Sequence, residues 1–136
     1  MLITLNSDEI VHIKYLQGQV IDVAEKKEEL QANLEITGGK KMPFLLSFES
    51  YVTITKEAKE YSIQIELQQP FLVTAIVVDN LAYQLMADFY FKFYKPRVPY
   101  KVFKSEERAL EWLKEYRNDY NQGKISSSKK LPFFHF

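Results

Sequence analysis

The spacing of apolar residues divides the chain into alternating strand and helix segments. Residues 2–5 and 9–16 predict a β-hairpin, because apolar and polar positions alternate in the second segment and turn-forming residues separate the two. Nearly continuous apolar runs at 44–48 and 71–79 predict two buried strands. A short alternating run at 100–104 predicts one further strand.

Helical periodicity predicts four helices among these strands. They cover residues 20–37, 56–69, 81–94 and 106–120. Thr55 and Ser105 are typical N-caps, and Gly38 is typical of a left-handed helix end. We expect an apolar face of each helix to pack on the sheet. For the first three helices these faces are Val20, Val23, Ala24, Leu30 and Leu34; then Ala58, Ile63 and Leu67; then Leu85, Met86, Phe89 and Phe93.

The element order predicts an α/β fold with a mixed sheet of about five strands covered by about four helices. The predicted domain covers residues 1–123, and residues 124–136 form a tail of different composition. A chain of 136 residues is long enough to bury the core of one domain.

Composition excludes several classes of function. Lys plus Arg and Asp plus Glu each count 18, so the net charge is zero, which argues against nucleic acid as a partner. The chain has no cysteine, which excludes disulfides and thiolate metal sites. The N-terminus has no signal-peptide pattern, and no apolar run is long enough to span a membrane, so we expect a cytoplasmic protein.

Three stretches carry a family resemblance. They are "DEIVHIKY", "TGGKKMPFLLSFES" followed by "ITKEAKEY", and "AIVVDNLAYQLMADFYFKFYKPRVPYKVFKSEERALEWLKEY". Together they resemble uncharacterised bacterial STAS-like proteins with the SpoIIAA-like fold, an architecture shared with CRAL-TRIO lipid-transfer domains. The resemblance covers residues 1 to 117 and implies that fold.

In the anti-sigma antagonist branch of that family, a serine after the central strand is phosphorylated to switch partner binding. Ser50, Thr53 and Thr55 lie at the matching place, so the resemblance makes them candidates for a phosphoswitch. Ser50 follows Glu49 where that branch has Asp. The alternative is that all three are turn and cap residues.

Catalytic motifs are scarce in this sequence. His12 is expected to face solvent from a strand, and His135 lies in the tail. Asp79 ends a buried strand, at the edge of the sheet where open α/β folds bind ligands, but its expected role is to cap the next helix. A hydrolase using Asp79 and a histidine is an alternative. We expect no enzyme activity, no metal and no cofactor.

The segment 88–104 is rich in aromatic and basic residues. Most of it is expected to form core and rim. The exposed remainder is a candidate surface for a protein partner or an anionic ligand. Its residues are Tyr90, Tyr94, Lys95, Arg97 and Lys101.

The tail ends in Phe133, Phe134 and Phe136, preceded by two lysines. Exposed phenylalanines forgo about 1.5–3 kcal/mol each relative to burial. We therefore expect the tail to dock on the domain or across a homodimer, with membrane contact as the alternative.

The function that these observations favour is a non-catalytic STAS-like regulatory or protein-interaction domain that acts as a homodimer. Its protein partner is not identified by the sequence. The alternative is a carrier of a small ligand or lipid, which would lie in an apolar pocket between sheet and helices.

Overall fold

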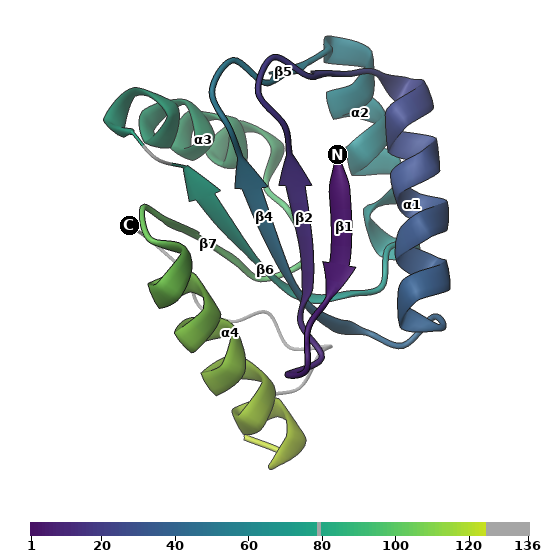
Figure 1. Cartoon of the computed structure of the whole chain (residues 1–136), viewed down its shortest axis with the longest axis vertical. Coiled ribbons are helices and arrows are strands. Elements are labelled where there is room, and N and C mark those ends of the chain that lie inside the picture. The colour runs from purple at the N-terminus through teal and green to yellow at the C-terminus, as the bar shows by residue number, and fades with distance from the viewer. Residues whose placement is uncertain (79, 125–136) are drawn as a thin grey trace.

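Five strands form one central sheet in the computed structural model, which describes residues 1–78 and 80–124. In spatial order they are β1 (Leu2–Leu5), β2 (Val11–Tyr15), β4 (Met42–Phe48), β6 (Phe71–Val78) and β7 (Tyr100–Phe103). β1 runs antiparallel to β2, and every other neighbouring pair is parallel. The hairpin, the mixed sheet and the two central strands are therefore confirmed (Figure 1).

Four α-helices surround the sheet in the described part of the chain (Figure 1). They are α1 (Val23–Thr37), α2 (Lys56–Ile65), which continues into the 3-10 helix η1 (Glu66–Gln68), α3 (Leu81–Tyr94) and α4 (Glu106–Asn121). Residues of α4 pack in a core cluster on one face of the sheet. Residues of α1 and α3 pack in two clusters on the other face. The predicted α/β fold is thus confirmed.

The first helix begins later than predicted. Val20–Ile21 forms a short strand, β3, which pairs in parallel with β5 (Thr53–Ile54). Asp22 then caps α1: its side chain accepts a hydrogen bond from the Val23 backbone, and Glu25 completes a capping box. Gly38 ends the helix at a φ of 64°, as its position predicted.

The predicted inner faces of α1 and α2 are wrong in part. α1 buries the polar residues Glu29, Asn33 and Thr37, whereas Ala24 and Leu34 are exposed. α2 buries Ala58, as predicted, together with Ile65. Ile63 and Leu67 are exposed. Hydrophobic spacing identified both helices but did not identify the face that each turns to the sheet.

The predicted inner face of α3 points away from the protein. Its large apolar side chains are 59% to 74% exposed. They are Leu81, Leu85, Met86, Phe89 and Phe93, here named the outer α3 face. The sheet is approached instead by Tyr83, Ala87 and Phe91, which pack beside Ile76 and Val102.

Both predicted N-caps of α2 and α4 are confirmed: Thr55 accepts the Ala58 backbone N–H, and Ser105 accepts that of Arg108. The N-cap of α3 is Asn80, not Asp79 as predicted, and Asp79 itself lies outside the described residues. Among the helices described, none has the length and apolar character needed to cross a lipid bilayer.

Candidate ligand-binding cavity

A cavity of about 860 Å³ lies between the sheet, α2 with η1, and α3. Its floor includes Leu46 and Phe48 of β4 and Ile76 of β6. Its roof includes Ala87 and Phe91 of α3. Alternation along the strands explains the floor, because every second side chain points to the same face of the sheet.

The cavity exists because α3 does not fill the space above the sheet. No residue of α3 is fully buried. The helix leaves Leu81, Leu85 and Met86 exposed, although Met86 also borders the cavity, and it places the small Ala87 over the sheet. The polar N-terminal part of α2, with Lys59 and Ser62, borders the same space.

Contacts from the loop before β5, from β7 and from α2 hold α3 over this space. The hydroxyl of Tyr83 accepts the backbone N–H of Tyr51 at 3.3 Å. The rings of Phe91 and Tyr100 lie 4.5 Å apart between their centroids. From α2, the ammonium of Lys59 lies 5.8 Å from the centre of the Tyr90 ring, a distance that permits a cation–π interaction.

Glu66 fastens the loop that follows α3. Its carboxylate accepts the backbone N–H of Arg97 at 2.9 Å and that of Val98 at 3.4 Å. Lys95, before this loop, ends α3 in the left-handed conformation at a φ of 48°. The loop is therefore held by a charge-assisted hydrogen bond from η1.

Four of the five residues predicted as a partner or anion surface line this cavity. They are Tyr90, Tyr94, Lys95 and Arg97. Lys101 is separate from them: its ammonium lies 5.3 Å from the Phe103 ring, which packs in the core cluster under α4. Because Lys101 and Phe103 are two apart in one strand, they share the face opposite the cavity.

Three basic side chains line the cavity near Tyr90 and Glu66. Lys95 and Arg97 are exposed, and Lys59 is half-buried. Within the described residues none of these three side chains forms an ion pair. Burial raises the pKa of Tyr90 to about 12, with smaller contributions from Tyr94 and Glu66, so the phenol stays protonated and can donate a hydrogen bond.

A buried polar cluster forms part of the cavity wall at α1. Glu29 is 2% exposed, and its carboxylate accepts hydrogen bonds from the Tyr15 hydroxyl and, at 3.2 Å, from the Lys26 ammonium. All three residues line the cavity. None of the three was predicted as a site residue. The available signals were the three-residue spacing of Lys26 and Glu29 on one helix and the position of Tyr15 on the same strand face as Val11 and Ile13.

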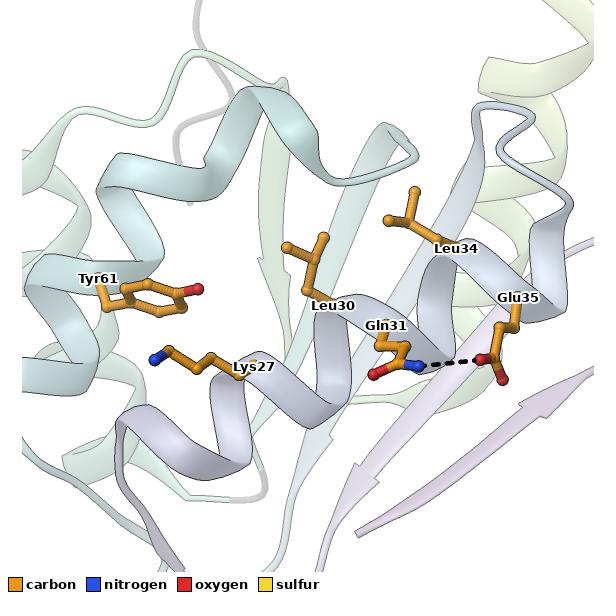
Figure 2. A pocket seen from close by; sticks show the side chains of 6 residues that line it. All are labelled: Lys27, Leu30, Gln31, Leu34, Glu35 and Tyr61. Carbon is orange, nitrogen blue, oxygen red and sulfur yellow. Dashed lines mark hydrogen bonds between the residues drawn. The ribbon is translucent and has the colours of Figure 1, made fainter.

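A second, smaller hollow lies between α1 and α2. It has a volume of about 340 Å³, and Figure 2 shows Leu30 and Leu34 projecting from α1, with Tyr61 of α2 at the end near Lys27. Lys27 lies 5.9 Å from the Tyr61 ring. The lining side chains are half-buried or exposed, so this hollow is a surface groove and encloses far less space than the first.

The candidate phosphoswitch residues have structural roles. The Ser50 carbonyl accepts the backbone N–H of Gly18, and Thr53 pairs in β5. Thr55 caps α2 and donates its hydroxyl hydrogen to Asp22 at 2.9 Å. The tail residues Phe133, Phe134 and Phe136 lie outside the described residues, as does His135.

His12 is half-buried and does not simply face solvent as predicted. Its Nε2 lies 2.6 Å from the Ser47 hydroxyl oxygen, and its Nδ1 lies 3.7 Å from Glu106. Burial lowers the pKa of His12, Glu106 raises it, and Lys14 lowers it slightly. Serine, imidazole and carboxylate in this order can transfer protons. However, none of the three lines either cavity described above.

Groups of three or more metal-ligating side chains do not occur among the residues that the structure describes.

Comparison with known proteins supports the fold and the family. One similar solved structure is an uncharacterised protein of the DUF3478 family with a SpoIIAA-like fold, from Shewanella loihica PV-4. It is 16% identical, with a TM-score of 0.58, over 82% of this chain and 90% of that one, so it shows the fold alone. A comparison with curated proteins gave no match. A family model matches residues 3–117, and the chain belongs to the family described as "Domain of unknown function (DUF7793)".

Proposed function

We propose that the protein is a non-catalytic binding domain that holds a small amphipathic molecule in the cavity beneath α3. The cavity of about 860 Å³ carries this proposal. Protein interiors contain few voids larger than a water molecule. Ligand pockets, by contrast, have volumes of about 300–1,000 Å³ and mostly apolar walls.

The charges on the lining residues indicate the ligand class. Its apolar part would contact Phe48, Ile76 and Phe91. An anionic group would lie near the side chains of Lys95 and Arg97, which are exposed, line the cavity and form no ion pair within the described residues; the Glu66 carboxylate nearby is bound to the Arg97 backbone. Arg pairs well with carboxylates and phosphates because its planar group donates two parallel hydrogen bonds. A long-chain carboxylate is the simplest molecule of this class.

A pair of variants on α3 tests the proposal. Ala87→Trp should fill the cavity, because Ala87 lines it. Ala82→Trp is the matched control, because Ala82 is exposed on the same helix. Isothermal titration of the full chain with dodecanoate should give one site for the natural protein and for Ala82→Trp. For Ala87→Trp we expect affinity at least tenfold lower.

Native mass spectrometry supplies an independent measurement on protein purified without denaturation. An added mass on the natural protein that is lost in Ala87→Trp would identify the class of the natural ligand. Equal binding of dodecanoate by both tryptophan variants would contradict the proposal, because the ligand would then lie elsewhere.

A second candidate function, contact between two copies of this chain, is favoured by the outer α3 face. Contiguous exposed apolar side chains of this kind are typical of interaction sites. Packing of two α3 helices around a two-fold axis would bury this face on both copies.

A further inference from the structure

The inner face of α1 is unusual because its buried residues are polar. Glu29, Asn33 and Thr37 follow one another at intervals of four residues and are all buried. A helix that packs on a sheet usually presents an apolar stripe there. Burying a carboxylate costs free energy even when it is paired, so the position of Glu29 needs a reason beyond packing.

Glu29 is held in place before any ligand binds. One carboxylate oxygen accepts the Tyr15 hydroxyl, and the other accepts the Lys26 ammonium. The Tyr15 ring stacks on Phe48, with centroids 4.5 Å apart and planes inclined by 14°. Burial, followed by the charge of Glu29, raises the pKa of Tyr15, so its hydroxyl remains a donor. The side chain of Lys26 is only 12% exposed.

The cluster has hydrogen-bonding capacity left over. An ammonium has three donors, and Lys26 directs hydrogens to Glu29 at 3.2 Å and to the Tyr15 oxygen at 3.4 Å. A carboxylate offers about four acceptor positions, so Glu29 can accept further bonds. All three residues line the cavity, and the cluster meets it chiefly through Lys26, whose side chain is 12% exposed while that of Glu29 is 2% exposed.

The charge of the cluster selects the kind of group that fits. Lys26 and Glu29 form an ion pair and together have no net charge. A charged ligand group beside this pair would have no counter-charge of its own, and burying an unpaired charge costs free energy. A neutral group that both donates and accepts fits best: its hydrogen goes to Glu29 and its oxygen accepts from Lys26. A hydroxyl is the simplest such group.

We propose that the Tyr15–Lys26–Glu29 cluster recognises a hydroxyl group on the apolar part of the bound molecule, so that the natural ligand is a hydroxylated amphiphile. This inference rests on the proposed function, because it needs a ligand in the cavity. It adds a chemical preference that an apolar cavity alone would not have. A cluster that served only to hold α1 on the sheet would show no such preference.

Matched probes distinguish recognition of a hydroxyl group from a purely structural role of the cluster. Dodecanoate is compared by isothermal titration with omega-hydroxydodecanoate and with mid-chain hydroxydodecanoates, each on the full chain. We expect at least one hydroxylated probe to bind about tenfold more tightly than dodecanoate, as for a hydrogen bond to a charged group. In an apolar cavity without the cluster, the hydroxyl would weaken binding.

Variants assign the preference to the cluster. Lys26→Met removes the ammonium and keeps most of the stem, and Lys27→Met is the control because Lys27 is exposed on the same helix. Glu29→Gln removes the charged acceptor with little change in shape, and it provides a second variant if Lys26→Met does not fold. We expect the tenfold preference to fall to twofold or less in both cluster variants and to persist in Lys27→Met. Affinity for dodecanoate should change little.

Three outcomes overturn the inference. If dodecanoate binds in the cavity but no hydroxylated probe binds more tightly, the inference fails and the proposed function stands. If the preference survives in both Lys26→Met and Glu29→Gln, the hydroxyl is recognised elsewhere. If no probe binds the natural protein, the proposed function and the inference fail together.

Discussion

Glu66 and Arg97 join two segments that are far apart in the sequence: the Glu66 carboxylate accepts the Arg97 backbone N–H at 2.9 Å. The bond ties η1 to the loop between α3 and β7, which lines the cavity. The structure therefore links the end of α2 to the end of the helix that roofs the cavity.

Replacing Glu66 should loosen that loop. Glu66→Ala leaves the N–H groups of Arg97 and Val98 without this acceptor, and we expect the free energy of unfolding to fall by about 1 kcal/mol. Hydrogen exchange measured by NMR should accelerate at the Arg97 amide, with little change in the β4 amides. Glu60→Ala on the exposed side of α2 is the control. Unchanged exchange at Arg97 would show that the carboxylate does not hold the loop.

Stability should depend on the ionisation of His12. Burial lowers the pKa of His12 below the unfolded value of 6.5, more than Glu106 raises it. Between those two pKa values the unfolded chain binds more protons, so stability rises with pH. We expect the free energy of unfolding to decrease as the pH falls through 6.5 and below. This contribution levels off once the pH is below the folded pKa.

Two variants test the source of this pH dependence by urea unfolding and NMR titration. His12→Gln should remove this part of the slope. Glu106→Gln should lower the pKa of His12 further, because the charge of Glu106 raises it. A His12 pKa at or above 6.5 in the natural protein would contradict the expected direction.

Thr55 should matter for stability through two hydrogen bonds. It accepts the Ala58 N–H at 3.1 Å and donates to Asp22 at 2.9 Å, which links the starts of α1 and α2. Thr55→Ala should cost about 1–2 kcal/mol in thermal or urea unfolding, whereas Thr55→Ser should cost less.

The same geometry gives an expectation for phosphorylation at Thr55. A phosphate there would face the Asp22 carboxylate, which offsets the favourable helix N-terminus. Thr55→Glu should therefore be no more stable than Thr55→Ala. A Thr55→Glu variant that is clearly more stable than the alanine variant would support the phosphoswitch interpretation instead.

The outer α3 face should control self-association. If two copies pack through it, Phe89→Asp places a charge on each side of the contact, and light scattering should show monomers at concentrations where the natural chain is dimeric. Val20→Asp, at an exposed apolar residue away from α3, should leave the dimer intact. Circular dichroism should confirm that both variants are folded.

Truncation after Gly123 distinguishes a dimer formed through the outer α3 face from one formed through the C-terminal segment. A dimer that survives truncation but not Phe89→Asp supports contact through α3. A dimer lost on truncation assigns self-association to the aromatic C-terminal segment, as the sequence suggested. If the natural chain is monomeric at all concentrations, neither contact forms.

Local sequence signals predicted the elements well. Gly38 and Ser105 have strong positional preferences, and the runs at 44–48 and 71–79 contain few polar residues, so helix ends and central strands followed from the residues themselves. β3 was not predicted because its two residues, Val20 and Ile21, extend the apolar spacing of the helix that follows them in the sequence. The cap residue Asp22 was the available signal.

The direction of the helix faces could not be predicted in the same way. Spacing shows that Leu85, Met86 and Phe89 share one side of α3, but not whether that side meets its own sheet, another molecule or solvent. The same limit applies to α1, where Glu29 and Asn33 occupy the buried side. Of the candidate site, the sequence predicted Tyr90, Tyr94, Lys95 and Arg97 as one group. It placed Lys101 with them because it could not show on which face of the sheet each residue lies.

The alternation along β6 divides the protein into two halves with different tolerance to change. Val73 and Ala75 are sealed under α4, whereas Thr74 and Ile76, one position away, border the cavity. Substitutions on the α4 side must preserve close packing, since the loss of even one methylene group there lowers stability. Changes on the cavity side alter a space that is already open. Substitutions at alternate residues of one strand can therefore change the shape of the cavity, while the opposite residues of that strand keep the domain folded.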